Sequence, residues 1–315
     1  MRDAHQSALL DAACRLNIEV DDRRNDWGVD AVYYRYGGRE LLVFDGRITQ
    51  GLSHTAAQVC LNKLATRSAL VELDLPVPAA LLASANSRSA VESLMESGPV
   101  VCKPSNGEWG DGVLMDLTMW EQVADHIEHL CGLALVEEQL HGMDLRIQAL
   151  GGTFEVACTR VPAEVVGNGS TNIASLVSDL SQQVIARNPD NRFVLDEVTV
   201  ELLQEQGLTL NDVPAAGRNV KLKRVANLSQ GGRAIDVTEG VHSDYYGWVE
   251  AIGEHLDMDF FAVDIVCEDP AQPPRESGAK ILEINAPCQW LSHTFSDHQT
   301  HDLPAKILTH LLRLP

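Results

Sequence analysis

The sequence lacks the features that mark membrane and secreted proteins. No run approaches the roughly 18 apolar residues that a membrane-spanning helix needs, and the residues after Met1–His5 form no apolar core of the signal-peptide kind. The seven cysteines include no C-x-x-C pair, and they are odd in number and widely spaced. This pattern argues against a structural zinc site and a disulfide framework, and it favours a reducing cytoplasm as the compartment.

Basic residues are also few, because 24 Lys and Arg stand against 45 Asp and Glu, a formal net charge of −21. So acidic a surface would repel nucleic acid and anionic membranes, and neither is expected as a partner. The rest of the composition is that of a globular protein, with 45% hydrophobic and 22% charged residues. A chain of 315 residues has room for about two domains.

Helical and strand patterns are interspersed without strict alternation, which indicates α+β layers rather than a doubly wound sheet. Helices are expected near residues 9–16, 55–73, 119–131, 172–185, 248–256 and 307–312. Strands are expected near residues 31–34, 41–44, 98–104, 133–136, 145–150, 153–159, 260–267 and 280–285. Residues 1–60 form a block that is too short to carry much chemistry alone, and we expect it to be a packing domain.

The first candidate site follows the buried strand that ends at Lys103. Three glycines lie within the six residues 107–112. An ammonium group beside unhindered backbone N–H groups suits phosphate oxygens, although the P-loop pattern is absent because no Gly-Lys-Ser/Thr follows. The alternative is that Asn106-Gly107 and Asp111-Gly112 are ordinary turns.

The second candidate site is formed by Asp264, Glu283 and Asn285. Asp264 interrupts an apolar strand, where an unpaired carboxylate would be costly. Glu283 and Asn285 are two residues apart on the next strand, so their side chains point to the same face. Three oxygen ligands on neighbouring strands would suit Mg²⁺, and the alternative is a salt bridge at the edge of the sheet.

These two patterns, with further motifs, resemble the ATP-grasp enzymes. The motifs of that resemblance are Asn62–Thr66 before a helix that ends at Leu75–Pro78, Val101–Pro104, Leu135–Glu138 and Glu283–Asn285. Five further motifs sharpen the match within the superfamily: Gly142–Arg146, Arg160–Gly169, Gln206–Leu210, Asp212–Pro214 and Ala226–Thr238. They resemble the cyanophycin-synthetase group, and the ATP-grasp half of bifunctional glutathione synthetases is similar too. The resemblance covers roughly residues 55–290, and residues 227–238 are its most specific part.

The resemblance implies an α+β ATP-grasp fold, in which two subdomains clasp ATP, together with a short N-terminal domain over residues 1–60. The implied segments are a small, lid-bearing subdomain over residues 61–135 and a large subdomain with the metal and substrate sites over residues 136–315. Lys63 and Lys103 would hold ATP phosphates, and a glycine loop with Gly107, Gly110 and Gly112 would fold over them.

The resemblance also assigns the remaining site residues. Backbone atoms of Glu137 and Glu138 would read the adenine edge, and Asp144 would hold the ribose hydroxyls. Asp264, Glu283 and Asn285 would bind Mg²⁺, with Mn²⁺ as a second candidate ion. Arg146 and Arg160 would cradle the substrate carboxylate and its acyl phosphate, since guanidinium groups suit planar oxyanions. Asn227 is a further predicted catalytic residue. Arg224 lies in a basic patch with Lys221 and Lys223 that could be a solvated strand face, but its position just before Asn227 favours contact with the anionic intermediate.

Two departures from the relatives fall where amino-acid substrates should bind. Ala286–His293 replaces the usual stretch after Asn285, and Glu164 stands where relatives often have histidine. The substrates of the relatives therefore cannot be transferred to this chain.

Weaker signals have simpler explanations. His293, His298 and His301 could form a metal cluster, but no helical or strand period joins them, and we expect solvated or hydrogen-bonded histidines. Cys288 lies close to the predicted metal site and could be mistaken for a nucleophile. An acyl-phosphate pathway needs no nucleophilic cysteine, so we expect a small buried hydrophobic residue there.

The sequence therefore predicts an ATP-dependent ligase that joins a carboxylate to an amine through an acyl phosphate. Amino acids or small peptides are the expected substrates, and a homodimer is compatible with this interpretation. Two alternatives remain open: a nucleotide-binding sensor or scaffold without catalysis, and an ATP-dependent small-molecule kinase.

Overall fold

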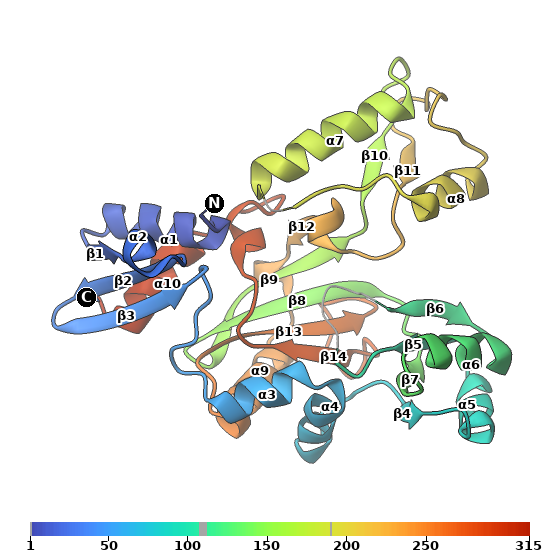
Figure 1. Cartoon of the computed structure of the whole chain (residues 1–315), viewed down its shortest axis with the longest axis horizontal. Coiled ribbons are helices and arrows are strands. Elements are labelled where there is room, and N and C mark those ends of the chain that lie inside the picture. Colours follow the sequence, from blue (N-terminus) through green and yellow to red (C-terminus); the bar gives the residue numbers. More distant parts are fainter. Residues whose placement is uncertain (1, 107–111, 190) are drawn as a thin grey trace. The chain divides into compact units, whose positions relative to one another are not determined.

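The computed structural model describes residues 2–106, 112–189 and 191–315, and the chain divides into two compact units (Figure 1). The first unit contains Met1–Gln50, Val156–Thr238 and Gln289–Pro315. The second unit contains Gly51–Glu155 and Glu239–Cys288. Both units combine stretches that are distant in sequence, whereas the segments 1–60, 61–135 and 136–315 are continuous and remain predictions.

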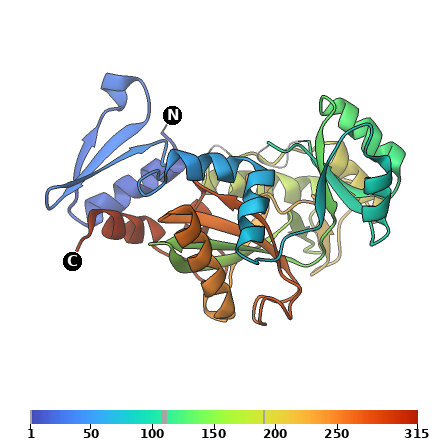
Figure 2. The ribbon, with the colours of Figure 1, turned by 90° about the horizontal axis from the view of Figure 1, so that it is seen from below.

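The N-terminal block of the first unit is a small antiparallel sheet with two packed helices. Its strands are β1 (Glu19–Asp22), β2 (Ala31–Tyr36) and β3 (Arg39–Phe44), in the order β1-β2-β3, and its first helices are α1 (Ala4–Arg15) and the short α2 (Arg24–Trp27). Helix α10 (Leu303–Leu312) lies beside α1 and also contacts β3 (Figure 2). The block is therefore completed by the far end of the sequence.

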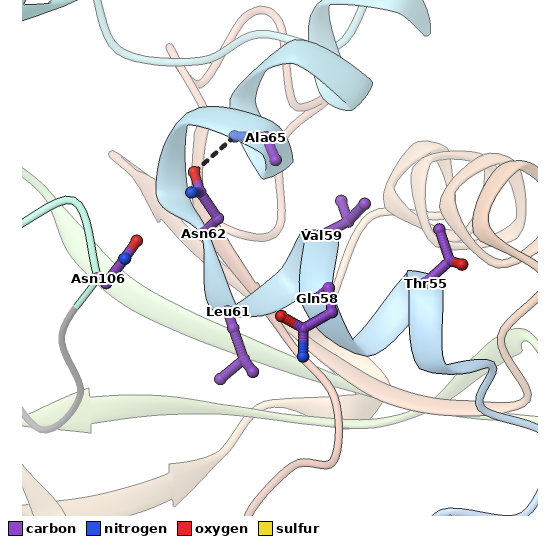
Figure 3. Close-up of a pocket in the computed structure, with 7 residues that line it drawn as sticks. All are labelled: Thr55, Gln58, Val59, Leu61, Asn62, Ala65 and Asn106. Atoms are coloured by element: carbon purple, nitrogen blue, oxygen red, sulfur yellow. Dashed lines mark hydrogen bonds between the residues drawn. The ribbon is translucent and has the colours of Figure 1, made fainter.

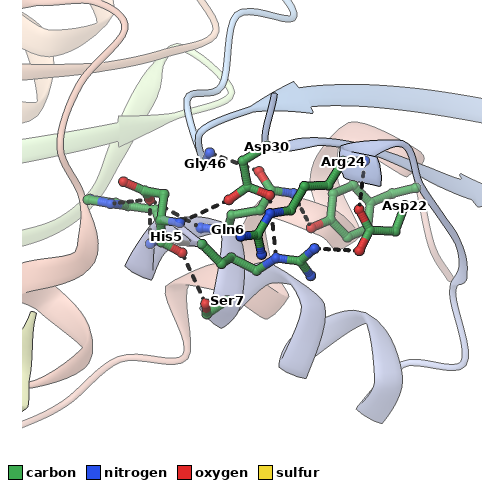
Figure 4. A network of polar contacts seen from close by, with 10 residues as sticks. His5, Gln6, Ser7, Asp22, Arg24, Asp30 and Gly46 are labelled. Atoms are coloured by element: carbon green, nitrogen blue, oxygen red, sulfur yellow. Dashed lines mark hydrogen bonds and ion pairs between the residues drawn. The ribbon is translucent and has the colours of Figure 1, made fainter. Parts of the chain in front are cut away.

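Gly46 is packed tightly into this block (Figure 4). Its amide donates to Gln6 Oε1 at 2.8 Å, and Gln6 Nε2 donates to Tyr34 Oη at 2.8 Å. The φ angle of Gly46 is +66°, and a Cβ atom built there would lie 2.3 Å from the His5 Cβ and 2.6 Å from the Gln6 nitrogen. Only glycine fits this contact, because the clash involves backbone and the φ angle is left-handed.

The remainder of the first unit is built around two strand pairs. Strand β9 (Thr153–Val161), which starts in the second unit, pairs with β12 (Arg233–Asp236), and β10 (Glu164–Val166) pairs with β11 (Asn219–Lys221). Helices α7 (Ile173–Arg187) and α8 (Glu197–Glu205) cover a core of buried aliphatic residues. Three short 3₁₀ turns occupy Leu228–Gln230, Thr238–Gly240 and Leu291–Thr294.

The second unit contains the antiparallel strands β8 (Met143–Leu150), β13 (Phe260–Cys267) and β14 (Lys280–Asn285), in the order β8-β13-β14. Strand β13 is almost entirely buried, as its apolar sequence predicts. Helices α3 (His54–Leu61) and α4 (Lys63–Glu72) contact β14, and α9 (Asp244–Leu256) precedes β13.

A second sheet in this unit has the order β4-β7-β5-β6. Its strands are β4 (Ala80–Ala83), β5 (Val100–Lys103), β6 (Leu114–Leu117) and β7 (Ala134–Glu138). Helices α5 (Arg88–Met95) and α6 (Trp120–His129) pack on one face, where Val100, Cys102, Ala134 and Val136 join their core. Side chains alternate along a strand, so Lys103, which follows Cys102, and Glu137, which follows Val136, lie on the opposite face of the sheet.

The single helix predicted over residues 55–73 is wrong in one respect, because the chain breaks it at Asn62. Asn62 has φ −108° and ψ 108°, which is extended backbone, and its Oδ1 accepts from the amides of Leu64 and Ala65, each at 3.0 Å. Asparagine competes for local backbone donors in this way and is a favoured N-cap.

Replacing Asn62 with alanine should lower the free energy of unfolding by about 1 kcal/mol, because two amides of α4 lose their acceptor. Urea unfolding would measure the change. Asn62→Asp is the matched control, since a carboxylate can still cap the helix, and an Asn62→Ala protein as stable as the wild type would contradict the capping role.

Candidate active site

A row of charged side chains crosses the sheet β8-β13-β14. Arg146 on β8 lies directly opposite Asp264 on β13, and Asp264 lies directly opposite Glu283 on β14. Directly opposite residues point to the same face of a sheet. Arg146 Nη1 lies 3.0 Å from Asp264 Oδ1 and 3.2 Å from Oδ2, and both side chains are buried. The strands thus bring together three residues that the sequence predicted for the site.

Asn285 links the two carboxylates of this row. Its Nδ2 lies 3.2 Å from Asp264 Oδ2 and 3.3 Å from Glu283 Oε1. Burial raises the pKa of the Glu283 carboxyl, the adjacent Asp264 raises it further, and the positive charge of Lys63 opposes both effects. Two neighbouring carboxylates that resist joint ionisation favour a bound cation, and two carboxylates with an amide oxygen suit Mg²⁺.

The two predicted lysines lie on different elements of the second unit. Lys63 is the first residue of α4, and its amide donates to the Ser105 carbonyl at 3.2 Å, so the start of this helix lies beside the segment that follows β5. Lys103 is the last residue of β5, and its ammonium forms a buried ion pair with Glu137 of β7. The sequence did not predict this ion pair. Glu137 therefore neutralises Lys103 with its side chain, in addition to the predicted contact of its backbone with adenine.

Glu138 bonds to residues of two other strands or loops of the second unit. Its amide donates to the Ala79 carbonyl at 2.9 Å, and its Oε1 accepts from the Ala79 amide at 2.6 Å and pairs with Lys280. The contact of the Glu137 and Glu138 backbone with adenine stays a prediction. Asp144 lies on β8 opposite Val266, on the same face of the strand as Arg146.

Of the predicted glycine loop, Gly107 and Gly110 lie outside the described residues. Gly112 has φ +69°, and an added Cβ would lie 3.0 Å from Pro104 Cγ and 3.3 Å from Leu130 Cδ2. Its carbonyl oxygen lies 2.8 Å from His126 Nε2. A glycine is required here both by the backbone conformation and by the close packing.

The other three predicted catalytic residues belong to the first unit. Arg160 lies on β9 opposite Ala234. The Arg224 guanidinium lies 2.5 Å from Glu205 of α8, and both side chains are about half exposed. Asn227 Oδ1 accepts from the amide of Ser229 at 3.0 Å and from its hydroxyl at 2.8 Å, so this side chain caps a 3₁₀ turn.

Glu164, the departure from the relatives' histidine, faces Arg233. The Arg233 Nη1 lies 3.5 Å from Glu164 Oε1, and its Nε lies 2.9 Å from Asp297 Oδ2. The guanidinium is thus held between two carboxylates of the same unit.

The three histidines near the C-terminal end of the sequence lie in different surroundings. His293 is buried, His298 is exposed, and His301 Nε2 lies 2.6 Å from Asp236 Oδ2. Within residues 2–106, 112–189 and 191–315, no three or more His, Cys, Asp and Glu side chains gather into a metal-binding group.

Cys288 is buried, and Gln148 Nε2 lies 3.2 Å from its sulfur. Burial raises the pKa of the Cys288 thiol to about 11, so the thiol stays protonated near neutral pH. Replacing Cys288 with alanine should therefore change ADP release by less than roughly threefold, the behaviour of a packing residue rather than a nucleophile. A coupled assay of ADP would test this, and a loss on the hundredfold scale of a missing catalytic group would assign the thiol to the chemistry.

The sequence did not predict a hollow of about 660 Å³ beside the break between α3 and α4 (Figure 3). Its lining residues are Thr55, Gln58, Val59, Leu61, Asn62, Ala65 and Asn106. Thr55, Gln58 and Leu61 recur every three residues along α3 and share one face. This spacing is the only signal in the sequence, and it does not differ from that of an ordinary exposed helix face.

Comparison with solved structures identifies the fold. The bifunctional glutathione synthetase of Pasteurella multocida matches 99% of the chain and 43% of its own length, with a TM-score of 0.74 and 25% identity. The ATP-grasp ligase PsnB, solved with a minimal precursor, matches 83% of the chain and 62% of its own length, with a TM-score of 0.50 and 13% identity. The chain has the ATP-grasp fold. The fold class and the resemblance predicted from the sequence are thereby confirmed.

Sequence comparison relates this ATP-grasp protein to two groups of synthetases. The cyanophycin synthetase of Trichormus variabilis is 30% identical over 239 residues, which are 73% of the chain and 26% of that protein. The glutathione biosynthesis bifunctional protein GshAB of Mannheimia succiniciproducens is 27% identical over 304 residues, which are 92% of the chain and 40% of that protein. The chain therefore spans well under half the length of these relatives. No protein-family model matches it, and no helix among its described residues is long and apolar enough to cross a membrane.

Proposed function

We propose that this ATP-grasp protein is a ligase that uses ATP to join a carboxylate to an amine. The observation that carries the proposal is the charged row Arg146, Asp264 and Glu283, with Asn285 between the two carboxylates. The positive charge of Lys63 acts on the same row, where it lowers the pKa of Glu283. The relationship to cyanophycin synthetases and to bifunctional glutathione synthetases supports an amide- or peptide-forming reaction.

In the proposed reaction, an oxygen of the substrate carboxylate attacks the γ-phosphorus of ATP, which gives an acyl phosphate and ADP. The amine then attacks the acyl carbon, an amide bond forms, and phosphate leaves with the bonding electrons. Lys63 and Lys103 would hold the ATP phosphates, Asp144 the ribose and the Glu137–Glu138 backbone the adenine. These residues act by positioning and by stabilising charge, which is the larger part of catalysis in phosphoryl transfer.

Asp264, Glu283 and Asn285 would hold Mg²⁺, or Mn²⁺ in its place. The ion would neutralise charge on the β- and γ-phosphates when bound. Arg146 holds the Asp264 carboxylate and would keep it oriented for the ion, in addition to its predicted contact with the substrate carboxylate.

Arg160, Arg224 and Asn227 would stabilise the acyl phosphate. Arg224 would have to leave Glu205 to do so, and this exposed ion pair is weak enough to break, since such pairs contribute about 0–1 kcal/mol. Asn227 would act through the turn that it caps, because its Oδ1 is already occupied by Ser229.

The test is a screen of amino acids and dipeptides, singly and in pairs, for ADP release, followed by mass spectrometry of the products. A ligase releases ADP only with two substrates and forms a product lighter than their sum by one water. Release with one substrate and a phosphorylated product would instead indicate a kinase. No release with any pair, together with ATP binding, would indicate a sensor or scaffold.

A further inference from the structure

The hollow beside α3 has the chemistry of a binding site for a small polar molecule. Its volume of about 660 Å³ falls within the range of about 300–1,000 Å³ that ligand pockets occupy. Gln58 and Asn106 present amide groups to it, and Thr55 presents a hydroxyl (Figure 3). Leu61 is 48% exposed at its edge, and burial of this apolar surface by a ligand would be favourable.

The hollow is connected along the chain to Lys63 of the candidate active site. Asn62 lines it and caps α4, and the next residue is Lys63, whose charge acts on Glu283. The Lys63 amide also bonds to the Ser105 carbonyl, and Ser105 precedes Asn106 of the lining. Two lining residues, Asn62 and Asn106, are thus the chain neighbours of Lys63 and Ser105, whose backbones hydrogen-bond to each other.

The charge of the lining sets the class of ligand. Among the lining residues that the structure describes, none is acidic or basic, while four have uncharged polar side chains: Thr55, Gln58, Asn106 and the helix-capping Asn62. A charged group bound there would find no opposite charge among these lining residues, whereas an uncharged polar group would find hydrogen-bond partners. An amide or hydroxyl would exchange its hydrogen bonds to water for bonds to Thr55, Gln58 and Asn106.

We infer that this hollow binds the side chain of one of the two substrates, and that it selects an uncharged, hydrogen-bonding side chain over a charged one. Gln58 is the main specificity-determining residue, because its amide is the exposed polar group at the centre of the α3 face. That the bound molecule is a substrate rests on the proposed function. The preference of the hollow for an uncharged side chain can be measured whether or not the protein is a ligase.

The experiment compares three amino acids of similar size and different charge: L-glutamine, L-glutamate and L-lysine. Each is titrated by calorimetry into the full chain loaded with Mg²⁺ and a non-hydrolysable ATP analogue. The wild type should bind L-glutamine at least about tenfold more tightly than the other two, a difference of about 1.4 kcal/mol. Gln58→Lys should move the preference to L-glutamate and Gln58→Glu should move it to L-lysine, each by a similar factor.

The matched control places the same charges on α4 outside the lining. Val71 is 55% exposed and does not line the hollow, so Val71→Lys and Val71→Glu should leave the order of affinities unchanged. The inference is overturned if L-glutamine does not bind at millimolar concentration, if a charged amino acid binds the wild type best, or if the Gln58 variants keep the wild-type order. It is also overturned if the Val71 variants produce the same shift.

The failure of this inference can be told apart from failure of the proposed function. If the Gln58 variants change the affinities as stated while no substrate pair releases ADP, the hollow binds the predicted ligand and the chain is not a ligase. If pairs release ADP and the Gln58 variants keep the wild-type order of affinities, the ligase proposal stands and the hollow is not the site of selection.

Discussion

Glu283→Gln is expected to reduce ADP release by at least about a hundredfold, the scale of losing one preorganised electrostatic group. The variant keeps the size of the side chain and removes its charge, so the Mg²⁺ ligand is weakened while packing is preserved. The same change should raise the melting temperature of the metal-free protein slightly, because it removes one of two adjacent carboxylate charges that disfavour each other. Activity and stability should therefore change in opposite directions.

Two measurements check this prediction: ADP release with the best substrate pair, and melting temperature with and without Mg²⁺. Mg²⁺ should raise the melting temperature of the wild type and have little effect on the variant. Glu250→Gln is the matched control, since Glu250 is an exposed residue of α9 in the same unit. Wild-type turnover in Glu283→Gln, or a loss of stability, would remove Glu283 from the proposed metal site.

Lys103→Met is expected to lower the free energy of unfolding by about 3 kcal/mol and to weaken ATP binding strongly. The first effect arises because Glu137 would be left buried without its partner, and breaking a buried ion pair costs about 3–5 kcal/mol. The second effect arises because the ammonium that we propose to contact ATP phosphate is lost. The double variant Lys103→Met/Glu137→Leu should recover the stability, since apolar replacement of a whole buried pair is often neutral, and it should not recover ATP binding.

Chemical unfolding and calorimetric titration with ATP separate these two effects. Arg88→Met provides the matched control, because Arg88 forms a 2.8 Å ion pair with Glu92 in which both side chains are about half exposed. That change should cost less than about 1 kcal/mol. If the double variant binds ATP as well as the wild type, Lys103 serves the fold alone. If the single variant loses no stability, the ion pair does not form as described.

The strands β13 and β14 of the candidate active site could be predicted from the sequence because their apolar runs are continuous and sharply bounded. The predicted strands 260–267 and 280–285 have the bounds of β13 and β14. Strand β1 (Glu19–Asp22) was missed because it contains a single apolar residue, Val20, and lies mostly exposed. The break at Asn62 was missed because helical spacing of apolar residues continues across it, and only the local capping bonds end the helix.

For the site residues, relations within one strand could be predicted from the sequence, whereas contacts between distant strands could not. The common face of Glu283 and Asn285 follows from strand alternation alone. The pairing of Lys103 with Glu137 does not, because these residues are 34 positions apart and β5 and β7 are not consecutive strands. The hydrogen bonds between Glu138 and Ala79 depend in the same way on how β4 and β7 come together.

The order of the strands has a consequence for how the chain folds. Arg146 and Asp264 are 118 positions apart, and β8 finds its partner β13 only when most of the chain exists. During synthesis, Arg146 leaves the ribosome long before the carboxylate that it will hold. Contacts of such long range slow folding and leave strand edges exposed in the meantime. We therefore expect the active-site sheet to form late, after the locally connected hairpin of β2 and β3, and we expect refolding yields to fall as protein concentration rises.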